Sequence, residues 1–506
     1  MTRPATTHRR RRSMEEGGPS GKKWKPAGVE TTDDGDEAAL PAETEAPDPA
    51  GVGEEDDDGP VDRISSLPDA VLGVIISLLP TDEGARTQIL SSKWRHLWLS
   101  APLNLDCTHL VGRCGRERAA GIVSRILSSH PGPGRRLCLK GYYFLPNFQV
   151  ARCYQVATVD AWLQSRALNK LQELEIGYYS MGVPLPSQTF RFAPTLRVAT
   201  LTGFKLPDST IQGLHFPLLK QLWLDCVSIS ECSLHSLIAC CPDLECLLIL
   251  QSIGFRCLRI NSLTLRNVGV GVDNYNDGEN CVQLKELIIE NAPCLKKLLH
   301  HHSVTSSLHV YVVSAPQVET IGHLSDGNYV FQRNLDSKLV FGSTIIQGLH
   351  VDKLAMVIRT VKTLAVQMNA LSLDTIIQLM PCFPCLEKLY IQAMENKSKT
   401  NNLWRRKHRD LTRCLDIRLK TIVLDSYRGM KSEVDFLTFF IMNARVLELV
   451  KLGGCSGNNE FLAEQRRKLQ LDKRASKVAQ IHFITGYCIR HFLNVHDLDL
   501  VDPFLL

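Results

Sequence analysis

A six-residue pattern, L-x-x-L-x-L, returns along the chain and restricts the folds that are open to it. Four copies begin 25, 23 and 25 residues apart, at Leu171, Leu196, Leu219 and Leu244. A helix-like stretch over residues 233–240 and a turn at Pro242 precede one of them. Each unit is therefore predicted to contain a helix, a turn and a strand, and to bury its apolar side chains only by stacking on its neighbours.

This spacing is that of leucine-rich repeats. The predicted fold class is α/β: a leucine-rich-repeat solenoid with a curved parallel sheet and helices outside. Later copies begin at Leu284, Leu386, Leu419 and Leu447, and their irregular spacing predicts that the later repeats carry insertions or are degenerate. Residues 325–360 show the weakest pattern, with Gly342 and Gly348 suggesting loops between short strands.

Alternation along each strand predicts which side chains leave the core. The fourth and sixth positions of the pattern point inward, and the third and fifth point outward. The outward residues have no single sign of charge and include two aromatic side chains, which often anchor interfaces. We predict that they line one continuous partner-binding face; the alternative is that insertion loops cover them or that they only pack against one another. The candidate residues are Glu173, Glu175, Gln221, Trp223, Leu248, Glu286, Lys388 and Tyr390.

Residues 62–106 form a second informative stretch, in which three short helices are predicted. Ser66 and Thr81 are suitable N-caps for the first two helices, Ser91 or Ser92 can cap the third, and Pro80 ends the first helix. The stretch is rich in apolar residues at helical spacing and too short to build a large core. The surplus of apolar surface predicts that a helix of a partner packs against it.

The stretch resembles an F-box. The matching residues are Leu67-Pro68, Leu79-Pro80-Thr81, Arg86-Thr87, Leu90-Ser91 and Trp94 to Trp98. The resemblance implies binding of a Skp-type adaptor, and through it a cullin, by Leu67, Pro68, Leu72, Ile75, Leu79, Pro80, Leu90, Trp94 and Trp98. Plant members usually carry Ala-Val where this chain has Gly84-Ala85. A glycine in a helix costs up to about 1 kcal/mol relative to alanine, and Ala85 removes apolar surface, so these two residues could weaken adaptor binding without changing its mode.

Residues 419–452 resemble the FBD domain of plant F-box/FBD/leucine-rich-repeat proteins. The resemblance rests on a strand, the turn Tyr427-Arg428-Gly429, a helix with three phenylalanines, and a second strand. The predicted domains are a disordered tail that is first basic and then acidic (1–60), the F-box (61–106), the repeats (107–415), the FBD domain (416–490) and a C-terminal tail (491–506).

The resemblance implies the substrate-recognition subunit of a Skp–cullin–F-box ubiquitin ligase, with an unknown protein as substrate and no catalytic residues or cofactor of its own. A repeat scaffold or nucleic-acid-associated protein with an F-box-like cap is the alternative. No uncharged apolar run reaches about 18 residues and no signal peptide is evident. We expect a location in the cytoplasm, the nucleus or both.

Three short motifs contain residue types that could bind a metal ion or phosphate groups. Cys382 and Cys385 form a C-x-x-C, but no second pair stands at zinc-site spacing. Residues 300–302 are three histidines, interpreted as a surface loop. Residues 404–409 are basic and include Trp404, a composition that could bind phosphates, although a solvated loop is the preferred interpretation.

Overall fold

A computed structural model describes residues 63–108, 116–139, 152–178, 181–272, 281–302, 308–325, 332–334, 338–341, 344–346, 358–393, 416–490 and 495–505. The chain divides into two units, residues 1–62 and residues 63–506, and every described residue belongs to the second. The predicted disordered tail and the basic segment 404–409 lie outside the described residues.

The N-terminal helical module contains α1 (Asp69–Leu78), α2 (Thr81–Arg86), the 3-10 helix η1 (Thr87–Ile89) and α3 (Ser92–Ser100). Three short helices were predicted here, but two of the predicted caps are wrong. Pro68 and Pro80 occupy the N-cap positions of α1 and α2, so Thr81 is already helical. Ser91 does precede α3 as its N-cap residue. The module has a small core of its own: Leu72, Ile76, Trp94, Leu97 and Ala101.

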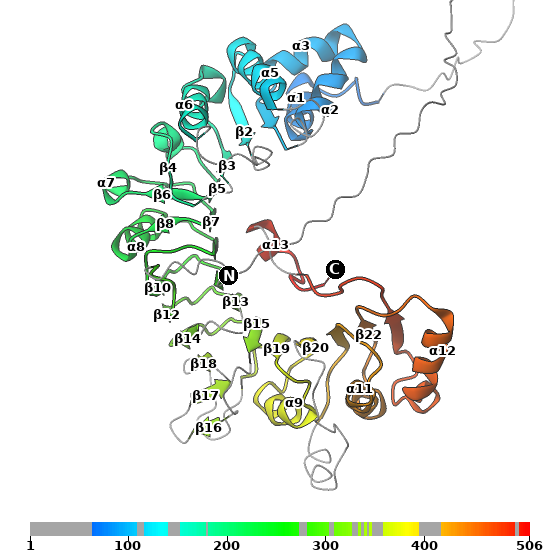
Figure 1. Cartoon of the computed structure of the whole chain (residues 1–506). Helices are drawn as coiled ribbons and strands as arrows, with labels where there is room; N and C mark the ends of the chain where they lie inside the picture. The colour runs from blue at the N-terminus through cyan, green and yellow to red at the C-terminus, as the bar shows by residue number, and fades with distance from the viewer. Residues whose placement is uncertain are drawn as a thin grey trace, which may run out of the picture. The chain divides into compact units, whose positions relative to one another are not determined.

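A parallel sheet of fourteen described strands forms the centre of the molecule (Figure 1). Its order is β1 (Leu103–Asp106), β2 (Gly134–Cys138), β3 (Glu173–Gly177), β5 (Val198–Thr202), β7 (Gln221–Asp225), β9 (Cys246–Leu250), β11 (Asn267–Val272), β13 (Lys297–His302), β15 (Thr320–Ser325), β19 (Thr363–Met368), β20 (Lys388–Ala393), β21 (Thr421–Asp425), β22 (Leu449–Leu452) and β23 (Gln480–Phe483). We call it the main sheet. The predicted α/β leucine-rich-repeat solenoid is confirmed.

The repeat pattern sets where the main-sheet strands from β3 to β22 begin. β7 starts two residues after Leu219, and β20 starts two residues after Leu386. The same offset identifies four further copies, at Leu265, Leu295, Val318 and Val361, which the leucine pattern alone does not reveal. Three of these copies depart from the pattern, because valine replaces a leucine or a glycine interrupts the row of larger side chains.

Helices cover one side of the main sheet over much of its length. They are α5 (Arg116–Ser129), α6 (Arg152–Leu163), α7 (Asp208–Ile211), α8 (Glu231–Ala239), α9 (Leu373–Leu379) and α11 (Lys431–Asn443). The large hydrophobic core includes Leu222 and Leu247 of the strands with Leu234 and Leu237 of α8.

The middle repeats differ from the expectation of helices outside. There a second sheet forms the outer layer, in the order β10 (Cys257–Asn261), β12 (Glu286–Asn291), β14 (His309–Val312), β18 (Thr344–Ile346), β17 (Lys338–Phe341) and β16 (Gln332–Asn334). Strict alternation of buried and exposed residues in β10 explains the change, because a helix cannot bury a period of two. Three shorter strands, β4 (Val183–Pro184), β6 (Phe204–Leu206) and β8 (Ser228–Ile229), form a third sheet.

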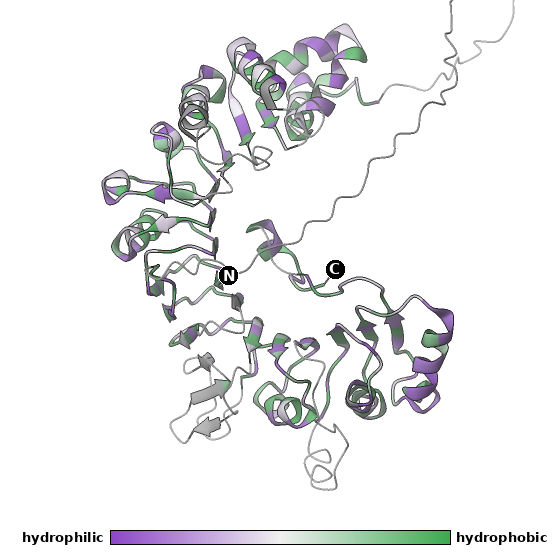
Figure 2. Cartoon of the chain, in the orientation of Figure 1, coloured by the Kyte–Doolittle hydropathy of each residue, from purple (hydrophilic) through white to green (hydrophobic). Residues whose placement is uncertain are grey.

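The C-terminal region continues the solenoid and then turns back. α11, β22, α12 (Asn459–Lys468) and β23 follow one another, and hydrophilic residues predominate on α12 (Figure 2). The predicted C-terminal tail contains the short helix α13 (Val495–Asp499). In Figure 1, α13 lies on the opposite side of the strands from α7 and α8.

Candidate interaction surfaces

The nine residues predicted to bind an adaptor divide into three groups in the helical module. Leu67, Pro68, Ile75, Pro80 and Leu90 are exposed, whereas Leu79 and Trp98 are half-buried. Leu72 and Trp94 lie inside the module core. Trp94 also donates a hydrogen bond from Nε1 to Ser65 Oγ, at 3.0 Å. In this conformation Leu72 and Trp94 therefore hold the helices together and are not available to a partner.

Several further apolar residues of the module, outside the predicted adaptor-binding set, are exposed. Ile89 is 85% exposed, and the others are Ile64, Val71, Val74, Leu78 and Leu99. Val71, Val74 and Leu78 stand at helical spacing along α1 and flank its core positions Leu72 and Ile76, a signal that the sequence itself carries. The module thus presents apolar surface although its own core is complete, and such surface commonly marks an interaction site.

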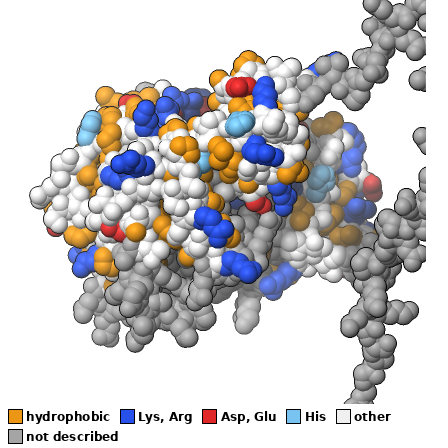
Figure 3. All heavy atoms as spheres, turned by 90° about the horizontal axis from the view of Figure 1, so that it is seen from above, with side chains coloured by type: hydrophobic (Ala, Val, Ile, Leu, Met, Phe, Trp, Pro, Cys, Tyr) orange, Lys and Arg blue, Asp and Glu red, His pale blue; other side chains and the backbone are white. Residues whose placement is uncertain are grey.

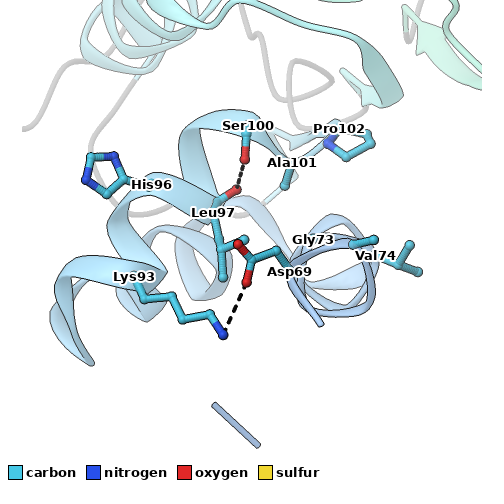
Figure 4. A pocket seen from close by; sticks show the side chains of 10 residues that line it. Asp69, Gly73, Val74, Lys93, His96, Leu97, Ser100, Ala101 and Pro102 are labelled. Atoms are coloured by element: carbon cyan, nitrogen blue, oxygen red, sulfur yellow. Dashed lines mark hydrogen bonds and ion pairs between the residues drawn. The ribbon is translucent and has the colours of Figure 1, made fainter. Parts of the chain in front are cut away.

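A groove of about 570 Å³ lies between α1 and α3 (Figure 4). Lys93 and Asp69 form an ion pair across it at 3.1 Å. Gly73, Val74 and Leu97 supply part of its wall. At the end of the molecule that bears the helical module, apolar side chains are interspersed with Lys and Arg side chains (Figure 3).

The helical module is fixed to the first strand of the main sheet through Thr81. The Thr81 hydroxyl donates to the Asn104 carbonyl at 2.7 Å and accepts from the Asp106 N–H at 2.8 Å. Asn104 Nδ2 donates in turn to the Leu79 carbonyl at 2.9 Å. These bonds are buried or partly buried, so the orientation of α2 is coupled to β1.

Glu173 and Glu175, two candidates for the partner-binding face, are engaged by Arg136. Its guanidinium lies 3.1 Å from Glu175, 3.6 Å from Glu173 and 2.7 Å from Asp106. Burial alone would lower the pKa of Arg136, but the Glu175 charge and these hydrogen bonds raise it well above its usual range. Burial would raise the pKa of Asp106, but hydrogen bonds from Thr108 and Arg136 lower it overall.

The exposure expected for the two aromatic candidates is wrong. Trp223 is 7% exposed and Tyr390 is completely buried, as is Leu248. They belong to an apolar row that runs across the main sheet at the fifth position of the repeats: Trp223, Leu248, Gly269, Leu299, Ala365, Tyr390 and Val423. Residues Val495–Leu505, which we call the C-terminal segment, pack on this row and cover it. Alternation along the strands correctly predicted that these side chains point out of the solenoid core, but it did not predict that the C-terminal segment covers them.

The remaining candidates for the partner-binding face lie in two different sheets. Gln221 and Lys388 occupy third positions in the main sheet and bind Asp499 and Asp502 of the C-terminal segment. Glu286 is exposed on β12, which belongs to the second sheet. The predicted face is therefore not continuous, because the strand of the copy at Leu284 belongs to the outer sheet and not to the main sheet.

The short motifs are part of the folded repeats. Cys382 is buried in the 3-10 helix η5 (Met380–Cys382) that follows α9, and Cys385 is half-buried. The histidine triplet is not a loop: it ends β13, and His300 is buried with Nε2 3.2 Å from Thr344 Oγ1. Within the described ranges, no group of three or more His, Cys, Asp or Glu residues could hold a metal ion. No described helix is long and apolar enough to span a membrane.

The stacked units define the class of leucine-rich-repeat proteins, here with a helical module at one end. A family model described as "FBD-associated F-box protein At5g56370, LRR repeats" matches residues 159–391, and the FBD model matches residues 407–452. Through its repeats and its FBD region the chain is similar to plant F-box/FBD/leucine-rich-repeat proteins.

Three relatives from Arabidopsis thaliana illustrate the similarity. FBD-associated F-box protein At5g60610 is 24% identical over 77% of this chain and 98% of its own length. F-box protein At4g27050 is 25% identical over 84% and 99%, respectively. F-box/LRR-repeat protein At3g59200 is 32% identical over 41% and 40%.

Proposed function

We propose that the chain is the substrate-recognition subunit of a Skp–cullin–F-box ubiquitin ligase. The helical module would bind the Skp-type adaptor, and the repeat and FBD regions would bind the protein to be modified. The observation that carries the proposal is the apolar surface that remains on the module after its core is complete, which includes Ile75, Ile89 and Leu90.

In this role the chain makes and breaks no covalent bond. The cullin and its associated subunits would bring the ubiquitin-charged enzyme, and this chain would hold a lysine of the substrate nearby. Holding two reactants together raises their effective concentration, which accelerates transfer without a catalytic group on the recognition subunit.

Capture of a purified plant Skp adaptor by the full chain tests this role. We expect Ile75→Asp with Leu90→Asp to weaken capture at least about tenfold, because a charge on desolvated apolar surface is unfavourable. Leu263→Asp is the matched control: Leu263 is 68% exposed and lies between β10 and β11, outside the module. It should leave capture unchanged.

Two results would contradict the proposal. One is a folded chain that fails to bind the adaptor. The other is undiminished capture by the double variant while its thermal unfolding matches that of the unaltered chain. Either result would favour the alternative, in which the chain is a repeat scaffold outside the ligase.

A further inference from the structure

The C-terminal segment is recognised by polar side chains that come from distant repeats. Asp499 accepts hydrogen bonds from Asn267 Nδ2 and Cys246 Sγ, both at 2.9 Å, and from Gln221 Nε2 at 2.5 Å. These three donors occupy the third position of consecutive repeats on β7, β9 and β11. One carboxylate therefore bridges three strands.

A second carboxylate is bound farther along the main sheet. Asp502 Oδ2 lies 2.7 Å from Lys388 Nζ and accepts a hydrogen bond from Tyr390 OH at 2.7 Å. Between the two carboxylates, Lys297 Nζ donates to the carbonyl oxygens of Leu498 and Leu500. Carbonyl oxygens are present in every peptide, so Lys297 recognises the main chain rather than a particular side chain.

Two apolar side chains of the segment are completely buried, and glycines of the main sheet provide their space. Leu498 lies over Gly269, and Phe504 lies over Gly322. A Cβ atom at Gly269 would come within 3.1 Å of Leu498 Cδ2, and one at Gly322 within 2.5 Å of Phe504 Cζ. The rings of Phe504 and Tyr390 also pack with their centroids 5.3 Å apart.

The segment is held by side chains and not by strand pairing with the main sheet. Within the described residues its sole β-bridge joins Leu505 to Ile489, and its helix is five residues long. Helices this short are not stable alone in water, so the order of the segment depends on the face that it covers. Val501, 96% exposed, adds little to the contact. Release of the segment would expose the apolar row but would remove no strand from the main sheet.

We propose that this face of the main sheet is a peptide-binding surface and that the C-terminal segment occupies it as an internal competitor. The partner in trans would be a protein segment with two carboxylates three residues apart and an aromatic side chain two residues later, as in Asp499, Asp502 and Phe504. The inference rests on the proposed function, for which it supplies the chemical class of the substrate segment.

Peptide exchange on the full chain tests the inference. The probe is a fluorescein-labelled synthetic peptide with the sequence of residues 495–506. We expect it to bind the Asp499→Asn, Asp502→Asn chain about tenfold more tightly than the unaltered chain, because weakening the internal segment by 1.4 kcal/mol is a factor of ten. A peptide with both aspartates replaced by asparagine should bind that variant about tenfold more weakly. Equal binding of the probe to both chains, or no binding to either, would overturn the inference.

Exchanging the two charges of the Lys388–Asp502 ion pair distinguishes loss of peptide recognition from damage to the fold. Adding Lys388→Glu to the double variant should abolish binding of the probe, and a peptide with lysine at the position of Asp502 should restore it. Failure of that rescue would also count against the peptide site. Adaptor capture is measured on the same variants. Loss of capture with intact peptide exchange would refute the ligase role alone, whereas loss of exchange with intact capture would refute only this inference.

Discussion

Gly84 of α2 lies against the indole of Trp98 in α3: a Cβ atom at Gly84 would be 2.6 Å from Trp98 Cζ3. In isolation a glycine within a helix weakens it. Here the missing side chain is what allows the two helices to pack with Trp98 in this position, so the glycine serves tertiary packing at the cost of helix propensity.

Gly84→Ala should therefore destabilise the helical module, although alanine is the better helix former. We expect a net loss of up to about 2 kcal/mol, since overpacking costs about 1–3 kcal/mol and the gain in helix propensity is about 1 kcal/mol. Chemical denaturation followed by tryptophan fluorescence measures it. Gly73→Ala in α1 is the control: nothing lies within 4 Å of its added Cβ atom, so it should be neutral or stabilising. Stabilisation by Gly84→Ala would contradict the packing argument.

Thr81→Val should loosen the connection between α2 and β1. Valine keeps the shape of the side chain but leaves the Asn104 carbonyl and the Asp106 N–H without their partner. Loss of a buried partner costs about 1–3 kcal/mol. Thr81→Ser retains the hydroxyl and should lose much less. Hydrogen exchange at the Asp106 amide reports the local effect, and equal protection in both variants would be incompatible with this role.

His130 should make the junction between the helical module and α5 sensitive to acid. Burial lowers the pKa of His130 from 6.5, partly offset by hydrogen bonds to the backbone of Trp98 and Ala101. Its Nδ1 also accepts from the Gly132 N–H at 3.0 Å, which requires an unprotonated nitrogen. Because the folded pKa lies below the unfolded one, this stability is complete above 6.5 and decreases as the pH falls toward the folded pKa.

The melting temperature between about pH 7 and about pH 5 measures that effect. We expect it to fall more in the unaltered chain than in His130→Gln, which cannot gain the proton. His96 is exposed on α3, so His96→Gln should behave as the unaltered chain does. Parallel curves for the unaltered chain and His130→Gln would rule out His130 as the source.

Tyr427→Phe should destabilise the FBD region. The buried Tyr427 hydroxyl donates to Gln465 Oε1 at 2.9 Å, and both side chains are at most 1% exposed. Removing the hydroxyl leaves a buried acceptor without this donor, at a cost of about 1–3 kcal/mol. Tyr487→Phe, at a residue 72% exposed, should change stability by less than about 0.5 kcal/mol. Urea denaturation compares the two, and similar midpoints would contradict the prediction.

Local pattern was sufficient for much of the fold. Repeat spacing predicted the solenoid, because each unit repeats the same short-range alternation and turn chemistry. The turn at Gly429 was expected from the resemblance to the FBD domain, and its φ of 74° is the backbone conformation that favours glycine. By contrast, the assignment of the Leu284 copy to an outer sheet depends on which neighbour its strand pairs with, and a single strand does not encode its partner.

The sequence by itself determined the repeat architecture, the three-helix module and the direction in which strand side chains point, since all three follow from periodicity within a few residues. Only the tertiary structure decided that Leu72 and Trp94 lie inside the module and that Trp223 and Tyr390 lie beneath the C-terminal segment. The physical reason is separation along the chain. Asp499 and Gln221 are 278 residues apart, and their contact exists only when the stacked repeats bring them together.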